Sequence, residues 1–257
     1  MNRISKYIPN PIKSAIKRCL VRYGRQFIAL NPDIRCAYSQ EGEDLVVSRL
    51  LSLDQFPRAG FYVDIGAHHP TRYSNTQYFY ERGWRGINID ANPGGMTSFN
   101  LLRPLDVNLE LAIAGKEQTL TFYEFSSPEL NGFSKELSMA RGSVPGCKIV
   151  NTRPVVARPL KWVMDEYLPA GVVIDFISVD VEGLDLEVIK SNDWNKYRPL
   201  LLLIEDSTVN TIQEACNSAL THFMQSQGYE LVSRTALTLI FAEKNHIVGG
   251  LFGARVK

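Results

Sequence analysis

Two acidic residues at the ends of apolar segments have the residue types and spacing of a nucleoside-binding site. Asp64 lies in the segment Phe61–Ile65 directly before Gly66, and Asp90 ends the next apolar segment. A glycine allows a tight turn with close approach of a ligand to the backbone, and an acid in the place of Asp90 can accept both hydroxyls of a ribose. The remaining glycines of GxGxxG are missing, and the chain contains no GxxxxGK[ST] motif. Without such a cradle for a pyrophosphate or triphosphate, the pattern favours a nucleoside that carries no phosphate.

Four further carboxyl groups end two later apolar segments. Asp180 and Glu182 are two residues apart at the end of one segment, so their side chains can point the same way. Glu205 and Asp206 end the next segment. Four carboxylates on neighbouring strand ends repel one another unless they are protonated or bind a cation. Ligands that are all oxygen favour Mg²⁺, Mn²⁺ or Ca²⁺ over zinc.

Two adjacent histidines follow the glycine turn and are alternative general bases. His68 and His69 come two and three residues after Gly66. Adjacent side chains rarely face the same space, so we expect at most one of them to face the site. His222 and His246 stand in no motif and are expected to be surface or structural residues.

The segments that carry these residues alternate between strand and helix patterns. Apolar runs predict strands over 61–65, 86–90, 107–114, 118–125, 174–180, 199–205, 229–233 and 237–243. Helical spacing predicts helices over 44–53, 75–82, 160–167, 184–190 and 209–227. Such a sequence predicts a doubly wound α/β fold, a mostly parallel sheet covered on both faces with an antiparallel hairpin at its end. Residues 126–153 show no clear period, and we expect a long lid or substrate loop there.

Several motifs, in their order along residues 38–243, resemble the FkbM family of methyltransferases. They are Tyr38-Ser-Gln-Glu-Gly-Glu-Asp44, Val63-Asp-Ile-Gly-Ala67, Tyr73-Ser-Asn-Thr76, Gly83-Trp-Arg-Gly-Ile-Asn-Ile-Asp-Ala-Asn-Pro93 and Ser178-Val-Asp-Val-Glu-Gly183. The resemblance implies a Rossmann-like class I methyltransferase with a seven-stranded sheet. It also implies an O-methyltransferase that uses S-adenosylmethionine, a nucleoside without phosphate. Its acceptor is a hydroxyl of a sugar or of a natural product, and we expect a sugar in a glycan or glycoconjugate.

The resemblance also implies which residues bind the cofactor: Gln40, Glu43, Asp64, Gly66, Asp90 and Asn92. Asp64 and Gly66 would line the methionine side, Asp90 would bind the ribose, and Asn92 would lie near the adenosine. The first two residues of the set match a helix that closes over the cofactor, or they form a polar cluster at a helix N-terminus.

The acids at the two later strand ends resemble those of metal-dependent sugar O-methyltransferases of antibiotic pathways. This implies Asp180 as the general base and Glu182, Glu205 and Asp206 as ligands of Mg²⁺ or Mn²⁺. Glu182 and Glu205 stand where those enzymes have Asp, and the longer side chain either still reaches a metal or binds substrate instead.

The charge of the chain is unevenly distributed. The 257 residues include 28 basic and 27 acidic side chains, a net charge of +1. Residues 1–30 hold seven of the basic residues and no acid, which leaves 21 basic against 27 acidic in the remainder. Apolar residues recur at helical spacing from Ile12 to Phe27, so residues 1–37 are predicted to be a basic amphipathic extension and residues 38–257 the methyltransferase domain. Such a helix lies on an anionic membrane surface or packs on the rest of the protein, and the acidic body predicts no nucleic-acid partner.

Four scattered cysteines, no secretory signal and no apolar run of about 20 residues predict a cytoplasmic protein, with the inner face of the membrane as the place of attachment. Two other functions stay open. An NAD-type Rossmann oxidoreductase is disfavoured by the missing GxGxxG. A non-catalytic binding module on a methyltransferase scaffold is disfavoured by the intact Asp64, Asp90 and Asp180.

Overall fold

The computed structural model describes residues 35–53, 57–127, 130–144 and 146–248, with only the backbone for Arg141 and Val248. All elements named below belong to one compact unit, Ala37–Lys257. The amphipathic extension predicted over residues 1–37 lies almost wholly outside the described residues and stays a prediction.

A seven-stranded sheet forms the centre of this unit. Its strands, in spatial order, are β3 (Val107–Glu110), β2 (Arg85–Asp90), β1 (Phe61–Ile65), β7 (Phe176–Val179), β8 (Leu201–Glu205), β10 (Thr238–Glu243) and β9 (Tyr229–Arg234). The first five run parallel, and β10 pairs antiparallel with both of its neighbours. The predicted mostly parallel, doubly wound sheet with a terminal hairpin is confirmed.

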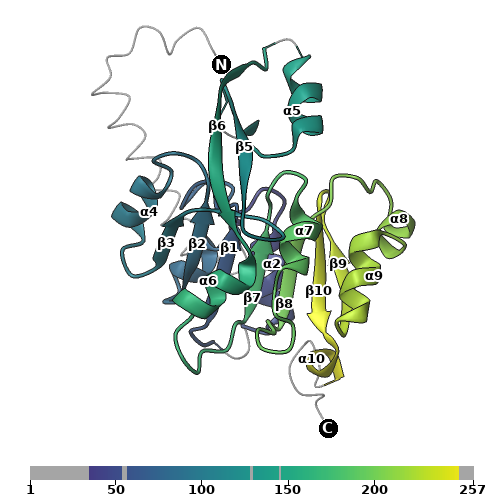
Figure 1. Ribbon diagram of the computed structural model, residues 1–257. Coiled ribbons are helices and arrows are strands. Elements are labelled where there is room, and N and C mark those ends of the chain that lie inside the picture. Colours follow the sequence, from purple (N-terminus) through teal and green to yellow (C-terminus); the bar gives the residue numbers. More distant parts are fainter. Residues whose placement is uncertain (1–34, 54–56, 128–129, 145, 249–257) are drawn as a thin grey trace, which may run out of the picture. The chain divides into compact units, whose positions relative to one another are not determined.

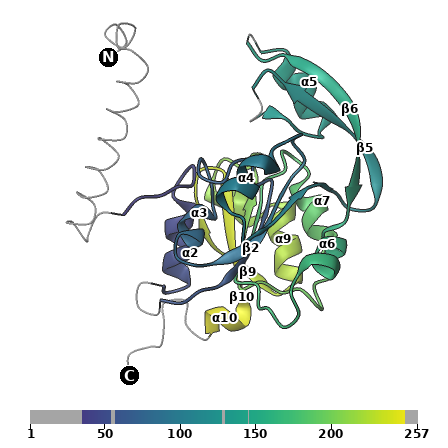
Figure 2. The same cartoon turned by 90° about the vertical axis from the view of Figure 1, so that its left-hand side faces the viewer.

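Helices cover both faces of this sheet, as Figures 1 and 2 show. One face packs on α2 (Glu43–Leu50) and α3 (Gln77–Tyr80), and the other packs on α6 (Leu160–Tyr167), α7 (Asp185–Lys190) and α9 (Ala219–Ser226). In β8, Leu201 and Leu203 face the first group of helices, whereas Leu202 and Ile204 face the second. Because successive side chains in a strand point to opposite faces, a strand covered on both sides is apolar throughout, which is why these runs were recognisable in the sequence.

The remaining helices differ from the sequence prediction. The pattern over 209–227 is two helices, α8 (Ile212–Cys216) and α9, because the Ser218 side chain accepts from the Thr221 backbone N–H and begins a new helix. The short helices α4 (Met96–Leu102) and α10 (Lys244–Val248) were not predicted. None of the described helices has the length and apolar character needed to cross a membrane.

A second, three-stranded sheet lies beyond one end of the main sheet (Figure 1). It has the order β4 (Ala112–Ile113), β6 (Ile149–Arg158), β5 (Gln118–Phe125). Strands β5 and β6 form an antiparallel hairpin, and the connection between them contains α5 (Lys135–Gly142), which lies beside the far end of the hairpin. The segment 126–153 without a clear period therefore contains a helix and the first half of a strand. Strand β6 was missed because it exposes apolar residues, such as Val150 and Val156, and so lacks a clean polar–apolar alternation.

Candidate active site

A pocket of about 230 Å³ opens at the carboxyl ends of β1, β2, β7 and β8, where the strand order reverses between β1 and β7. Ligands of doubly wound sheets bind at such a reversal. Ten of the twelve predicted site residues line the pocket: Gln40, Glu43, Asp64, Gly66, His68, Asp90, Asn92, Asp180, Glu182 and Glu205. His69 and Asp206 do not.

The turn at Gly66 is held tightly against the neighbouring strand end. Gly66 has φ +83°, and a Cβ there would lie 1.7 Å from the Asp180 carbonyl oxygen. The backbone N–H groups of Gly66 and Ala67 donate to the Ile89 carbonyl oxygen at 2.9 and 3.0 Å. Glycine is therefore required at position 66 because the protein backbone, and not only a ligand, comes close to it. The turn joins the ends of β1, β2 and β7.

Asp64 is buried beneath the pocket and is oriented by neutral donors. The Thr76 hydroxyl donates to its carboxylate at 2.9 Å, and the fully buried Arg103 donates in turn to the Thr76 hydroxyl at 2.7 Å. Burial raises the pKa of Asp64 to about 6, although the Thr76 hydrogen bond and the Arg103 charge oppose that rise. Arg103 stands in no motif, so its part in this arrangement is visible only in three dimensions.

Asp90 is nearly buried, and its carboxylate is oriented by two backbone groups. The N–H of His68 donates to one oxygen at 2.8 Å, and the N–H of Asn92 donates to the other at 2.7 Å. A carboxylate has about four acceptor positions, so two contacts leave capacity for further donors. A pair of ribose hydroxyls is a ligand of that kind.

Asp180 and Glu205 form a carboxyl pair at the ends of the adjacent strands β7 and β8. The Asp180 carboxyl is open to the pocket but recessed within the protein. This recessed position raises its pKa well above the usual range, and the Glu205 charge, a hydrogen bond with Glu205 and the Glu182 charge raise it further. Such a group takes up a proton more readily than an ordinary carboxylate does.

The turn after Asp180 has an unusual backbone. Glu182 has φ +56°. This left-handed conformation is energetically unfavourable for any residue that has a Cβ atom. The Asp185 carboxylate stabilises the turn by accepting from the N–H groups of Val181 and Gly183, both at 3.0 Å. Burial raises the pKa of Asp185 to about 7. A strained turn held by a dedicated anchor is typical of functional sites.

The two histidines differ in surroundings, as expected. His68 lines the pocket, whereas the His69 Nδ1 accepts from the backbone N–H groups of Thr71 and Arg72 at 3.1 and 3.2 Å. Burial, followed by the Arg72 charge, lowers the pKa of His69. His69 therefore orders its own loop, and only His68 stays in reach of a ligand in the pocket.

The residues predicted to bind a metal are not assembled into one site. Asp206 lies outside the pocket, and its carboxylate accepts from the Thr208 backbone N–H at 3.1 Å and from the Thr208 hydroxyl at 2.5 Å. Within the described ranges, no group of three or more His, Cys, Asp or Glu side chains is placed to hold a metal ion. The side chains present in the described residues do not fit a divalent cation.

The N-terminal end of α2 closes another side of the pocket. Glu43 accepts from the Thr235 hydroxyl at 2.9 Å, and Glu41 accepts from the Leu237 N–H at 3.0 Å. These bonds hold α2 against the β9–β10 turn, while Gln40 is exposed in the pocket wall. The contact joins residues almost 200 positions apart and has no signal in the sequence.

Part of the pocket wall comes from residues that sequence reasoning missed. Leu111, Ala112 and Ile113 directly follow β3, whose carboxyl end lies at the same edge of the sheet, and that position is a signal that could have found them. Phe122 and Phe133 come from the second sheet and its loop, with ring centroids 4.9 Å apart. Nothing in the sequence places these two rings over the main sheet.

The charge of the pocket is strongly one-sided. Its lining contains seven carboxylic acids and no lysine or arginine: Glu41, Glu43, Asp64, Asp90, Asp180, Glu182 and Glu205. The donors to four of these acids are backbone N–H or hydroxyl groups, which carry no compensating charge. The field in the pocket favours a cation over an anion.

A seven-stranded sheet of this order, with an acid at the end of each strand around the reversal point, defines a Rossmann-like methyltransferase. The family model described as the methyltransferase FkbM domain matches residues 64–231, and the chain belongs to that family. No curated protein and no solved structure matches the chain.

Proposed function

We propose that this methyltransferase transfers the methyl group of S-adenosylmethionine to a hydroxyl on a sugar of a glycan or glycoconjugate. The observation that carries the choice of cofactor is the acidic pocket lining around Asp90. S-Adenosylmethionine has a ribose, a net positive charge and no phosphate. The pyrophosphate of NAD would meet seven carboxyl groups and no lysine or arginine of the lining.

The roles of the residues follow from their positions. Asp90 would accept the ribose hydroxyls, Asn92 and the segment Leu111–Ile113 would border the adenosine, and Asp64 would lie beneath the methionine portion. The Asp64 and Asp90 carboxylates are already held by backbone and hydroxyl donors, so little reordering is needed when a ligand arrives.

Bound S-adenosylmethionine supplies a methyl group on a positively charged sulfur, which is reactive without further activation. The protein's part is to align the acceptor oxygen and to remove its proton. In its ionised form, Asp180 takes the proton of the acceptor O–H as the oxygen–carbon bond forms and the sulfur–carbon bond breaks, and it later releases that proton to solvent. The raised pKa of Asp180 makes it a stronger base than an ordinary aspartate.

A sugar acceptor is supported by the family resemblance and by the aromatic side chains at the pocket. Phe122 and Phe133 line the wall contributed by the second sheet, and Tyr73 is 57% exposed in a left-handed turn with φ +53°. Aromatic faces cover the C–H faces of a sugar ring, while Asn75 and Asn131 in the same lining offer hydrogen bonds to its hydroxyls.

Calorimetric titration of the full chain with S-adenosylmethionine, S-adenosylhomocysteine and NAD tests the assignment. We expect binding of the first two and none of NAD. Binding of NAD alone would replace the proposal with an oxidoreductase. A methyl-transfer screen over nucleotide sugars, lipid-linked glycans and free oligosaccharides then identifies the acceptor, and cofactor binding without any transfer would favour a non-catalytic module.

The basic residues 1–30 support a further part of the proposal, attachment to an anionic membrane surface from the cytoplasmic side. Lipid-linked glycans are assembled at membranes, so attachment would bring the pocket to that class of acceptor. An acidic body and a basic N-terminus together favour a membrane surface over nucleic acid as the anionic partner.

A further inference from the structure

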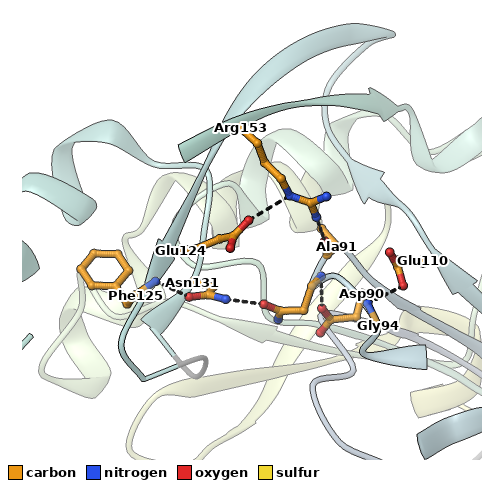
Figure 3. Close-up of polar contacts among 9 residues, drawn as sticks. Asp90, Ala91, Gly94, Glu110, Glu124, Phe125, Asn131 and Arg153 are labelled. Carbon is orange, nitrogen blue, oxygen red and sulfur yellow. Dashed lines mark hydrogen bonds and ion pairs between the residues drawn. The ribbon is translucent and has the colours of Figure 1, made fainter. Parts of the chain in front are cut away.

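The β5–β6 hairpin is joined to the turn after β2 by two polar side chains (Figure 3). Asn131 and Arg153 come from the second sheet and its loop, and both reach the segment Asp90–Asn92 of the pocket. These contacts join residues that are 39 and 62 positions apart in the sequence. Asn131 and all three residues of the segment Asp90–Asn92 also line the pocket.

Asn131 uses both ends of its amide in this contact. Its oxygen accepts from the Phe125 backbone N–H at 2.7 Å, and its nitrogen donates to the Asn92 side-chain oxygen at 2.5 Å. The backbone N–H can only donate, so it determines which end of the amide is the oxygen and leaves the NH₂ group for Asn92. The Asn92 N–H donates in turn to Asp90, so a chain of hydrogen bonds runs from the hairpin to the predicted ribose-binding carboxylate.

Arg153 makes a second link beside the first. Its Nη2 donates to the Ala91 carbonyl oxygen at 3.2 Å, and its Nε lies 3.0 Å from a Glu124 carboxylate oxygen. The contact with Glu124 is an ion pair without a hydrogen bond, because the Nε–H does not point at the carboxylate oxygen. The guanidinium also lies 5.5 Å from the ring centroid of Phe122, a residue of the pocket wall.

The segment 131–137, which follows β5, also contacts the turn after Asp180. A Cβ on Gly132 would lie 3.3 Å from the Glu182 Cβ, and a Cβ on Gly183 would lie 2.7 Å from a methyl group of Leu137. Residues 131–137 therefore lie between the segment that follows β2 and the turn that follows β7. A shift of the hairpin would therefore displace both the segment after β2 and the turn after β7.

We propose that Asn131 and Arg153 are positioning residues that fasten the β5–β6 hairpin to the Asp90–Asn92 turn, so that cofactor binding orders the hairpin wall beside Asp180. The inference rests on the proposed use of S-adenosylmethionine. It adds that the cofactor subsite and the acceptor wall are energetically coupled through these two side chains.

A double-mutant cycle on cofactor affinity tests the Asn131 link. Calorimetry with S-adenosylmethionine is carried out on the full chain, on Asn131→Ala, on Asn92→Ala and on the double variant. Loss of one hydrogen bond weakens binding by about fivefold, so we expect Asn131→Ala to have a fivefold lower affinity for S-adenosylmethionine. Adding Asn131→Ala to Asn92→Ala should weaken binding by less than twofold further, because the bond is already absent.

Asn151→Ala is the matched control, since Asn151 is an exposed asparagine of the same hairpin that lies outside the pocket lining. It should bind the cofactor as the unmodified chain does. An unmodified chain that fails to bind S-adenosylmethionine would overturn the proposed function. Normal binding by the unmodified chain together with unchanged affinity in Asn131→Ala, or losses that multiply in the double variant, would overturn only the positioning role.

Hydrogen exchange measures the coupling directly. Saturating S-adenosylmethionine should slow amide exchange across residues 118–126 by about fivefold in the unmodified chain and in Asn151→Ala. Arg153→Lys keeps a charge beside Glu124 but has no second nitrogen for the Ala91 carbonyl, so we expect it to lose most of this slowing. Equal slowing in Arg153→Lys and Asn131→Ala would refute the coupling, and the unliganded exchange rates show whether either variant has disturbed the hairpin itself.

Discussion

Two carboxyl groups that oppose each other's ionisation define the chemistry of the site. Asp180 and Glu205 end adjacent strands, and the charge and hydrogen bond of Glu205 contribute to the raised pKa of Asp180. Removing the proton from an alcohol requires a strong base near neutral pH, and a carboxylate becomes one when a like charge raises its pKa. Of this pair, Asp180 is the proposed proton acceptor, and Glu205, which the sequence suggested as a metal ligand, would act by raising the pKa of Asp180.

Replacing the proposed base tests this assignment. Asp180→Asn keeps the size of the side chain but cannot accept the proton, so we expect methyl transfer to fall by about 10²–10⁴-fold. The dissociation constant of S-adenosylmethionine should change by less than about twofold. Asp193→Asn, the same exchange outside the pocket, is the control. Activity that survives in Asp180→Asn would make His68 the better base.

The pH dependence of the rate gives a second test at the same residue. The ionised form of Asp180 is the active one and its pKa is raised, so the rate should increase with pH and level off only above the usual carboxyl range. Glu205→Gln removes the neighbouring charge, so the inflection of the pH–rate profile should move to lower pH by on the order of one unit. Glu182→Gln should move it less, since Glu182 is the weaker influence. A larger shift in Glu182→Gln would contradict the pairing.

Among the elements, three strand ends depend on one glycine. The turn after β1 donates to the end of β2, and the Asp180 carbonyl oxygen of the β7 end lies where a Cβ of Gly66 would be. Asp180 donates its N–H to the Ile65 carbonyl oxygen at 2.9 Å, which holds the two strand ends at this spacing. A side chain at position 66 would separate the residues that the chemistry needs together.

Gly66→Ala should therefore destabilise the protein much more than a glycine substitution at a similar backbone angle elsewhere. The clash with the backbone and the left-handed conformation together should cost about 4 kcal/mol of unfolding free energy. Gly83→Ala is the matched control, because Gly83 has φ +86° and no atom within 4 Å of the Cβ position, and it should cost about 1 kcal/mol. Urea denaturation measures both, and equal losses would show that the close approach to Asp180 has no energetic weight.

Prediction of the elements succeeded where burial leaves a local pattern. Inner strands such as β8 are almost entirely apolar because helices cover both faces. The positions of all seven strands of the main sheet agree with the sequence prediction to within a few residues. Strand β6 was missed because much of it is exposed. The helix predicted over 209–227 is two helices, separated at the Ser218 N-cap. The apolar spacing continues across this break, so the sequence pattern did not reveal it.

For the whole molecule, the distribution of charge matters more than its total. The net charge of +1 combines a basic N-terminal region of 30 residues with an acidic remainder. In the described unit seven of the acids line the pocket together with no lysine or arginine, which suits the proposed cationic cofactor. Electrostatic attraction to an anionic surface is therefore proposed for residues 1–30 alone.

Deleting residues 1–30 should release the protein from vesicles that contain anionic lipid. Co-sedimentation with phosphatidylserine vesicles, compared with neutral phosphatidylcholine vesicles, measures this binding at low and at physiological salt. Each basic residue near such a surface contributes about 1 kcal/mol, so removing seven should abolish measurable association. The affinity for S-adenosylmethionine should not change. Undiminished vesicle binding by the shortened chain would place the membrane contact after residue 30 and contradict this proposal.

The sequence by itself determined the doubly wound fold, the family and the acids at the strand ends, because the ends of buried strands and the turn glycine are local patterns. The tertiary structure decided which of those acids share the pocket: Asp206 turns to Thr208, whereas Asp180 and Glu205 pair. It also brought Asn131 to Asn92. These outcomes depend on side-chain direction at strand ends and on contacts between distant segments, which packing decides and no local pattern records.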